Sequence, residues 1–236
     1  MTNFGQTNIY NCSYPEYSLK LLEYWIKHKD NYPKVIKEYL DVHLLDYIND
    51  ARMIPDALFQ IYAHLKIIKL EYNFYEMVAE FYCDYFSNPY DKEIIDVGCG
   101  CYPITSEILQ KRITANEGKG NITAYDPDLV ITSLKPITLK KELFTDLTKL
   151  NDEAFLFGMF PCDATELMIT KALKEKKELC IQLCNCVPEK YKQSLSYEEW
   201  INLLYSEIVN NISSDFKYDL FYLDRRLRPV LALKRK

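Results

Sequence analysis

The stretch from Glu93 to Pro103 constrains the fold more than any other part of this chain. A short apolar run ends there in Gly98-Cys99-Gly100, and a segment compatible with a helix follows from Ile104 to Gln110. A strand, a glycine turn and a helix start, in this order, are how α/β proteins hold a nucleoside ligand. Glycine is needed because the turn requires left-handed backbone angles and lets the main chain approach the ligand closely.

Pro103 occupies the third glycine position of the dinucleotide-binding pattern G-x-G-x-x-G. Proline suits the first turn of a helix, but it departs from the pattern that binds a pyrophosphate. A nucleoside without a diphosphate therefore fits this turn better than NAD or FAD.

From residue 91 onward, short apolar segments alternate with helical ones. This alternation predicts a parallel sheet whose strands are joined by helical crossovers. Only residues 224–228 separate the last two segments, and a link this short predicts an antiparallel hairpin. The predicted strands are 93–98, 121–125, 137–144, 154–160, 178–184, 216–223 and 229–234.

The first 90 residues have a helical pattern instead. Apolar positions recur every three or four residues from Leu58 to Phe86, which predicts a long amphipathic helix that ends at Asn88-Pro89. Shorter helices are predicted at 17–29 and 32–49. The sequence thus predicts a helical N-terminal domain over residues 1–90 and an α/β domain over residues 91–236.

The segment Ile95-Asp-Val-Gly-Cys-Gly100 resembles motif I of the class I S-adenosylmethionine-dependent methyltransferases. The resemblance covers residues 91–236 and implies a Rossmann-like, mostly parallel seven-stranded sheet with an antiparallel C-terminal hairpin. Such enzymes often carry a substrate-selecting helical extension, so residues 1–90 are expected to cover the cofactor cleft. S-adenosylmethionine is the implied cofactor, held by residues of this motif: Asp96, Gly98, Cys99 and Gly100.

The resemblance extends to an acidic residue that ends the second strand and binds the ribose hydroxyls of the cofactor. Asp126, followed by Pro127, closes the strand-like segment 122–125 and takes this place. It comes 28 residues after Gly98, compared with about 20 in the dinucleotide-binding fold, and the polar loop 116–121 absorbs the difference. Asp146 is a further candidate, for a contact with the adenine.

The segment from Phe157 to Glu166 stands where the superfamily keeps motif IV, beside the methyl group to be transferred. Asp163 and Glu166 are the candidate general bases there. A structural interpretation competes with this one: Asp163 or Thr165 caps the next helix, predicted over 167–177, and Glu166 complements its dipole. Pro161-Cys162, which fixes the turn at this point, favours the catalytic interpretation.

Eight cysteines could indicate disulfides or a metal site, but their spacing supports neither. The chain has no C-x-x-C pair, and its three histidines lie in predicted helices far from the cysteines in sequence. A structural zinc site normally shows paired ligands two to four residues apart. The sequence therefore predicts reduced core thiols and no metal.

The net charge of −5 and an isoelectric point near 5.4 give no overall attraction to nucleic acid or to an anionic membrane. No apolar run approaches the roughly 20 residues of a membrane span, and residues 1–14 lack the pattern of a signal peptide. We therefore expect a cytoplasmic protein whose substrate is a small molecule or a protein, with RNA less favoured. The sequence leaves the oligomeric state open.

Three alternative functions stay open. Gly98-x-Gly100 followed by Pro103-x-Thr105-Ser106 is also similar to nicotianamine synthase, which transfers the aminobutanoyl group of the same cofactor. The other two alternatives are an RNA methyltransferase and a non-catalytic S-adenosylmethionine-binding protein. The Asn/Asp-Pro-Pro-Tyr/Phe motif of enzymes that methylate exocyclic base amines is missing, which disfavours that chemistry.

Overall fold

The computed structural model describes residues 27–31, 34, 37, 74–129, 131–184, 187–224 and 227–236. The chain divides into two compact units, Met1–Phe74 and Tyr75–Lys236. In the first unit the described residues include the short 3-10 helix η2 (Lys29–Asn31). Of the helices predicted at 17–29 and 32–49, the structure also describes Lys27, His28, Lys34 and Lys37, which are helical. The remaining residues of these helices lie outside the described residues, and the covering role of the N-terminal domain stays a prediction.

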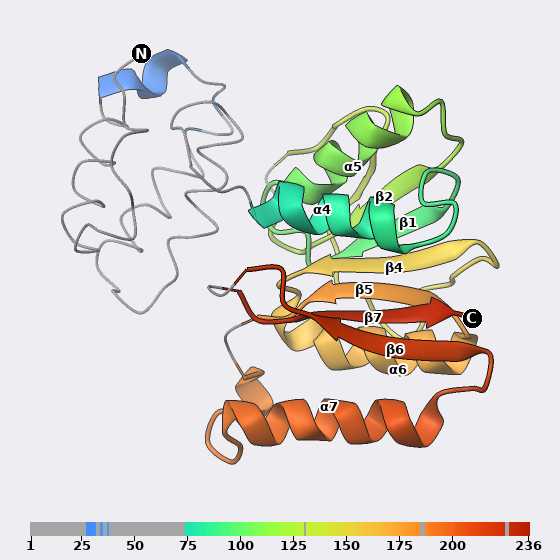
Figure 1. Ribbon diagram of the computed structural model, residues 1–236. Helices are drawn as coiled ribbons and strands as arrows, with labels where there is room; N and C mark the ends of the chain where they lie inside the picture. Colours follow the sequence, from blue (N-terminus) through green and yellow to red (C-terminus); the bar gives the residue numbers. More distant parts are fainter. Residues whose placement is uncertain are drawn as a thin grey trace. The chain divides into compact units, whose positions relative to one another are not determined.

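A seven-stranded sheet forms the centre of the second unit (Figure 1). Its strand order is β3-β2-β1-β4-β5-β7-β6. The neighbours from β3 to β5 pair in parallel, and β7 pairs antiparallel with both β5 and β6. The α/β Rossmann-like fold with an antiparallel C-terminal hairpin is therefore confirmed. The strands are β1 (Glu93–Val97), β2 (Asn121–Tyr125), β3 (Thr138–Lys140), β4 (Ala154–Met159), β5 (Glu178–Gln182), β6 (Phe216–Phe221) and β7 (Val230–Arg235).

The prediction was wrong in extent for β3, which was expected over residues 137–144. The strand pairs with β2 through only three residues and lies at the edge of the sheet. Residues 141–143 are exposed, and Phe144 turns back into the core, where its ring lies 5.7 Å from that of Tyr125. An edge strand makes backbone hydrogen bonds to one neighbour only. Few bonds are therefore lost where the chain leaves the sheet after Lys140.

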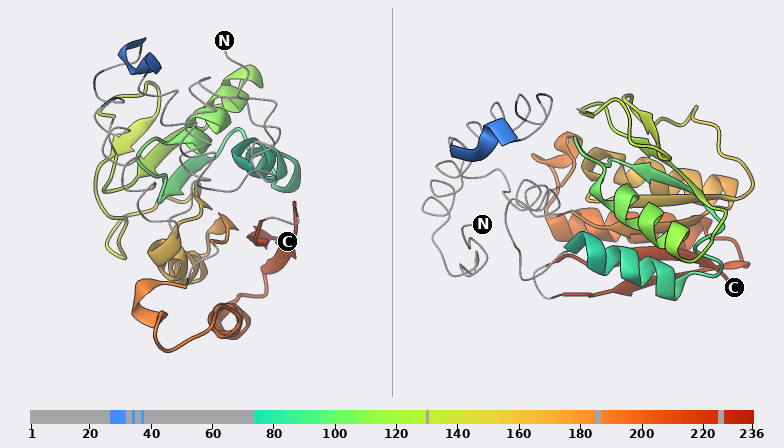
Figure 2. Two further views of the ribbon diagram at one scale, coloured as in Figure 1. Left: turned by 90° about the vertical axis from the view of Figure 1, so that its left-hand side faces the viewer. Right: turned by 90° about the horizontal axis from the view of Figure 1, so that it is seen from above.

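The helices described in this unit lie on both faces of the sheet. They are α4 (Phe74–Tyr85), α5 (Ile104–Ala115), α6 (Thr165–Glu175) and α7 (Tyr197–Asn211), with the 3-10 turns η3 (Cys162–Ala164) and η4 (Glu189–Tyr191). Figure 2 shows α4 and α5 side by side on one face. The sequence analysis did not single out α7, although Ser196 and Glu199 form a complete capping box at its start.

Alternating strand residues explain how both faces are filled, since successive side chains of a strand point to opposite sides. On one face, Tyr82 of α4 packs against Phe155 and Phe157 of β4, with ring centroids 4.8 and 5.8 Å apart. On the other face, Leu156 joins a buried cluster with Trp200 of α7 and with residues of α6. Because α4 packs on the sheet, the second unit begins at Tyr75, whereas the sequence-based boundary was placed after Tyr90.

The order of the strands reverses between β1 and β4. From β1 the chain runs outward to β2 and β3, and it then returns to place β4 on the other side of β1. Ligands of open α/β sheets bind outside the carboxyl ends of the strands at such a switch point. The fold therefore predicts a ligand site formed by the residues that follow β1 and β4.

In the part of the chain that is described, every helix is too short or too polar to cross a membrane.

Candidate functional site

The glycine turn after β1 is fixed to the end of β2. The N–H groups of Gly98 and Cys99 both donate to the Tyr125 carbonyl, at 2.9 and 3.3 Å. Gly98 and Gly100 have φ angles of +69° and +77°, in the left-handed region that side chains with a Cβ rarely adopt. The turn thus takes the conformation for which the sequence predicted glycine.

Asp126 holds the glycine turn from the other side. Its Oδ2 accepts the Gly100 N–H at 2.9 Å, its Oδ1 accepts the Asp128 N–H at 2.8 Å, and its own N–H donates to the Lys140 carbonyl at the end of β3. Partial burial raises the pKa of Asp126, and the two backbone hydrogen bonds act in the opposite direction. The structure therefore brings together the glycine turn and the acid that the sequence predicted as a pair, with Pro127 exposed beside them.

Asp96, the fourth residue of β1, is fully buried behind the turn. Ser106 of α5 donates to its Oδ2 at 2.6 Å, while Oδ1 has no hydrogen-bond partner among the described residues. Burial raises the pKa of Asp96 to about 7, and the neighbouring charge of Asp126 adds to this effect. An unpartnered buried carboxyl oxygen next to a glycine turn is what a site for a hydrogen-bonding ligand would leave when no ligand is present.

Cys99 lies between the two glycines and is half-buried. Burial, followed by the charges of Asp96 and Asp126, raises the pKa of its thiol. The thiol is therefore protonated at neutral pH, which fits packing against a ligand better than nucleophilic attack.

The segment after β4 carries unusual backbone angles on both sides of Pro161. Phe160 and Cys162 have φ angles of +57° and +44°, which are uncommon for residues other than glycine. The Phe160 N–H donates to the Gln182 carbonyl of β5 at 3.0 Å, which anchors this conformation to the sheet. Such strain persists where the surrounding structure imposes it, often at functional sites.

Pro161 also contacts the glycine turn directly. A Cβ added to Gly98 would lie 3.0 Å from Pro161 Cα, whereas a Cβ on Gly100 would meet no atom within 4 Å among the described residues other than its chain neighbours. One glycine is thus required by contact with the β4 segment, and the other borders open space. A ligand entering at the switch point between β1 and β4 would find that space beside Gly100.

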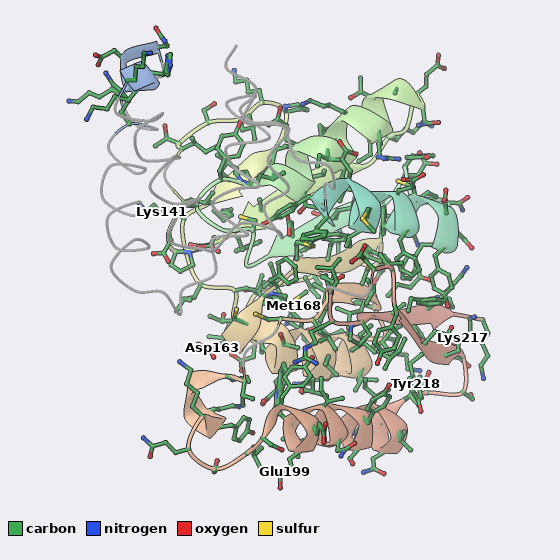
Figure 3. All side chains as sticks on the ribbon, turned by 60° about the vertical axis from the view of Figure 1, so that its left-hand side comes forward. Lys141, Asp163, Met168, Glu199, Lys217 and Tyr218 are labelled. Carbon is green, nitrogen blue, oxygen red and sulfur yellow. The ribbon has the colours of Figure 1, made fainter. Side chains whose placement is uncertain are left out.

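The two candidate bases lie in different environments. Asp163 is exposed in η3, at the side of the carboxyl ends of the strands, where Lys141 also follows β3 (Figure 3). Glu166 is held within the protein: its Oε1 accepts the indole N–H of Trp200 at 3.1 Å, and its Oε2 lies 2.6 Å from Lys190 Nζ and 3.5 Å from Tyr191 Oη. These contacts join α6 to η4 and α7.

The prediction that Asp163 or Thr165 caps α6 was wrong. The N-cap is Ala164, and no side chain makes a capping hydrogen bond there. The preceding 3-10 turn satisfies the helix start through the backbone, since the Ala164 N–H donates to the Pro161 carbonyl at 2.9 Å. The Thr165 hydroxyl is buried and, as far as the described residues show, has no hydrogen-bond partner.

Asp146 is exposed in the loop between β3 and β4. Its backbone carbonyl accepts a hydrogen bond from the buried Lys171 of α6 at 2.8 Å, which ties the loop to the helix. Glu142, which was not among the predicted residues, follows β3 by two residues at the carboxyl edge; burial, followed by the charge of Glu142, raises the pKa of Tyr125. Its position directly after a strand was the signal that could have identified it.

Gln182, the last residue of β5, is fully buried and was not among the predicted site residues. Its side-chain nitrogen donates to the Arg228 carbonyl at 2.5 Å, and its Oε1 has no partner in the described segments.

Two cavities lined by described residues lie away from the glycine turn. One of about 330 Å³ is at the amino ends of the strands beside Lys92, and one of about 420 Å³ lies between α6 and α7. The candidate site is defined by the topology of the sheet and by the contacts of the glycine turn, not by the size of a cavity.

Comparisons with known proteins add the following. No family model matches the chain, and no curated protein matches it by sequence. Among solved structures, the S-adenosylhomocysteine-bound methyltransferase PaMTH1 of Podospora anserina is similar at 10% identity and a TM-score of 0.47, over 95% of this chain and 97% of that one.

Two further solved structures are similar. A protein of Corynebacterium glutamicum is 10% identical with a TM-score of 0.47, over 84% of this chain and 96% of that one. The 23S rRNA methyltransferase ErmE is 16% identical with a TM-score of 0.40, over 69% of this chain and 67% of that one. Since all three scores are below 0.5, we draw no conclusion about substrate from them. The strand order and the antiparallel C-terminal hairpin give this chain a seven-stranded Rossmann-like α/β fold.

Proposed function

We propose that this protein is an S-adenosylmethionine-dependent methyltransferase whose acceptor is a small molecule or a protein side chain. The hydrogen bond from the Gly100 N–H to the Asp126 carboxylate carries the proposal. It joins the glycine turn of β1 to the acid that ends β2, beside the switch point of the sheet. These are the two parts of a nucleoside-binding site, and they come from segments 26 residues apart.

The cofactor would be held on two sides of the turn. Gly98, Cys99 and Gly100 would contact its methionine part, and Asp126 with Pro127 would contact the ribose. Each Asp126 oxygen accepts one backbone N–H in the structure and has a further lone pair for a ribose hydroxyl. When bound, the cofactor supplies a methyl group already activated on a positively charged sulfur.

Two further carboxyl groups belong to the proposed cofactor site. Asp96 would offer its unpartnered Oδ1 behind the turn. Asp146 is proposed to contact the adenine, and Glu142 is the neighbouring carboxylate that could take this role, because it lies closer to the end of β3. Replacing each by its amide and measuring affinity for adenosine would separate the two.

For catalysis, we propose Asp163 as the general base. It follows Pro161 at the carboxyl edge of β4 and is exposed, so an acceptor could reach its carboxylate. Glu166 shares the segment, but Trp200, Lys190 and Tyr191 surround its two oxygens. This environment supports a positioning role for Glu166, in which it fixes the start of α6 and with it the segment that carries Asp163.

The choice of acceptor rests on the charge of the whole chain. A net charge of −5 gives no overall attraction to a phosphate backbone. A small molecule or a protein side chain is therefore favoured over RNA.

A binding and product assay tests the proposal. Calorimetry should show that the full-length chain binds S-adenosylmethionine and S-adenosylhomocysteine but not NAD. Methyl-labelled cofactor is then incubated with metabolite, protein and RNA pools. S-adenosylhomocysteine as product supports methyl transfer, methylthioadenosine supports aminobutanoyl transfer, and binding without turnover supports a non-catalytic binder. Salt-sensitive labelling confined to the RNA pool would contradict the proposed acceptor class.

A further inference from the structure

Two cysteines that are far apart in the sequence meet at the carboxyl edge of the sheet. Cys162 follows β4, and Cys184 follows β5. The two strands are parallel neighbours, with Met159 opposite Gln182 as the last pair in register. The sulfur atoms of Cys162 and Cys184 lie 3.5 Å apart.

The backbone around Cys162 fixes this position. Both Phe160 and Cys162 have positive φ angles, and the Phe160 N–H donates to the Gln182 carbonyl two residues before Cys184. The turn therefore directs the Cys162 side chain toward β5. Cys162 is partly exposed to solvent, whereas Cys184 is buried with 5% exposure. A reagent would thus reach Cys162 first.

We infer that Cys162 and Cys184 are a reversible disulfide site beside the glycine turn. A disulfide bond is about 2.05 Å long, so the sulfur atoms need to approach by only about 1.5 Å.

The oxidant is a low-molecular-weight disulfide such as glutathione disulfide. The Cys162 thiolate, formed by loss of its proton to solvent, attacks one sulfur of glutathione disulfide and releases one glutathione thiolate. The Cys184 thiolate then attacks the Cys162 sulfur of the mixed disulfide and releases the second glutathione. Two protein thiols are oxidised to one disulfide, and one glutathione disulfide is reduced to two thiols.

Closing this bond would act on the glycine turn through Pro161. Pro161 precedes Cys162, and its Cα is the atom that a Cβ on Gly98 would approach to 3.0 Å. Movement of Cys162 toward β5 therefore moves the residue that contacts Gly98. We expect the oxidised form to bind S-adenosylhomocysteine less tightly than the reduced form; this consequence rests on the proposed function, whereas formation of the bond does not.

The test uses the full-length protein in glutathione buffers of increasing oxidised fraction. Remaining thiols are blocked with N-ethylmaleimide, and the protein is cut after lysine, which separates the two cysteines because Lys171, Lys174, Lys176 and Lys177 lie between them. We expect a cross-linked peptide assigned by fragmentation to Cys162 and Cys184, lost on treatment with dithiothreitol. Calorimetry with S-adenosylhomocysteine should show loss of affinity in the oxidised sample and recovery after reduction.

Matched variants make each outcome informative. Cys162→Ser should abolish both the cross-link and the oxidation sensitivity, while Cys83→Ser, at a half-buried thiol on α4, should change neither. Cys186→Ser should also retain the cross-link. No cross-link in wild-type protein, or a bond from Cys162 to Cys186, would overturn the inference. A bond between Cys162 and Cys184 with unchanged affinity would overturn its effect on the glycine turn.

Discussion

Gly98 and Pro161 touch across the switch point of the sheet: a Cβ on Gly98 would lie 3.0 Å from Pro161 Cα and 3.3 Å from its Cβ. Gly98 follows β1, and Pro161 follows β4. The two strands are neighbours in the sheet, although β4 begins at Ala154, 57 residues after the end of β1 at Val97. The contact places the glycine turn directly against the segment that follows β4. A substitution in the glycine turn should therefore alter the position of the segment after β4, and the reverse should also hold.

Gly98→Ala should destabilise the protein more than Gly100→Ala. Both residues have positive φ, which costs about 1–2 kcal/mol once a Cβ is present. Only Gly98 also faces Pro161, and overpacking of this kind adds about 1–3 kcal/mol. Denaturant unfolding of the two variants measures the difference. Equal losses of unfolding free energy would show that Pro161 moves aside without cost.

Asp126→Ala should weaken S-adenosylmethionine binding by about 1.5–3 kcal/mol, the range for hydrogen bonds to a charged group. Asp128→Ala is the matched control, because the hydrogen bond from Asp128 to Asp126 comes from the backbone N–H, which the variant keeps, and the Asp128 side chain is exposed. We expect its affinity to stay within about 0.5 kcal/mol of the wild type. Calorimetry that finds the same affinity for Asp126→Ala as for the wild type would remove Asp126 from the cofactor site.

Asp163→Asn should lower turnover by roughly 10²–10⁴-fold while cofactor affinity and stability stay nearly unchanged, as expected for loss of a general base. Asp152→Asn serves as the control, since this exposed carboxylate lies just before β4 at the opposite edge of the sheet. Steady-state kinetics on the identified acceptor provide the measurement. Full activity in Asp163→Asn would show that another group removes the proton from the acceptor.

Glu166→Ala should lower the unfolding free energy by about 1–3 kcal/mol, because the buried indole N–H of Trp200 loses its acceptor. Lys190→Ala should cost less than about 1 kcal/mol, because Lys190 is largely exposed and its ion pair with Glu166 is screened by solvent. Glu166→Gln keeps an oxygen for Trp200 and should retain turnover. A loss of turnover of about 100-fold or more in a stably folded Glu166→Gln would instead identify Glu166 as a base.

The pH dependence of stability should report Asp96. Its pKa in the folded protein is about 7, above the value of about 3.9 in an unfolded chain, so the native state holds a proton that the unfolded state has lost. This contribution is fully present below about pH 4 and is lost as the pH rises through about 7. We expect a loss on the order of 2–4 kcal/mol, which Asp96→Asn should lack. Urea unfolding from about pH 4.5 to about pH 8 compares the two proteins; parallel curves would show that Asp96 is ionised in the fold.

The sequence by itself determined the strands and the glycine turn. Buried runs such as Phe155–Met159, and Ile94–Val97 apart from Asp96, are apolar because helices cover both faces of a parallel sheet, and this local signal is readable without coordinates. Gly98 and Gly100 were equally clear, since few other residues accept their backbone angles. The pairing of Asp126 with the turn followed from the order of these elements.

Only the tertiary structure decided what the individual polar side chains do. Glu166 stood in a sequence position that suited a base, a helix start or an ion pair, and its bond to Trp200, 34 residues away, could not be read from local pattern. The same holds for the raised pKa of Asp96 and for the approach of Cys162 to Cys184, which depend on burial and on neighbouring strands. Strand formation is governed by nearby residues, whereas hydrogen-bond partners and desolvation are set by segments that meet only after the sheet has formed.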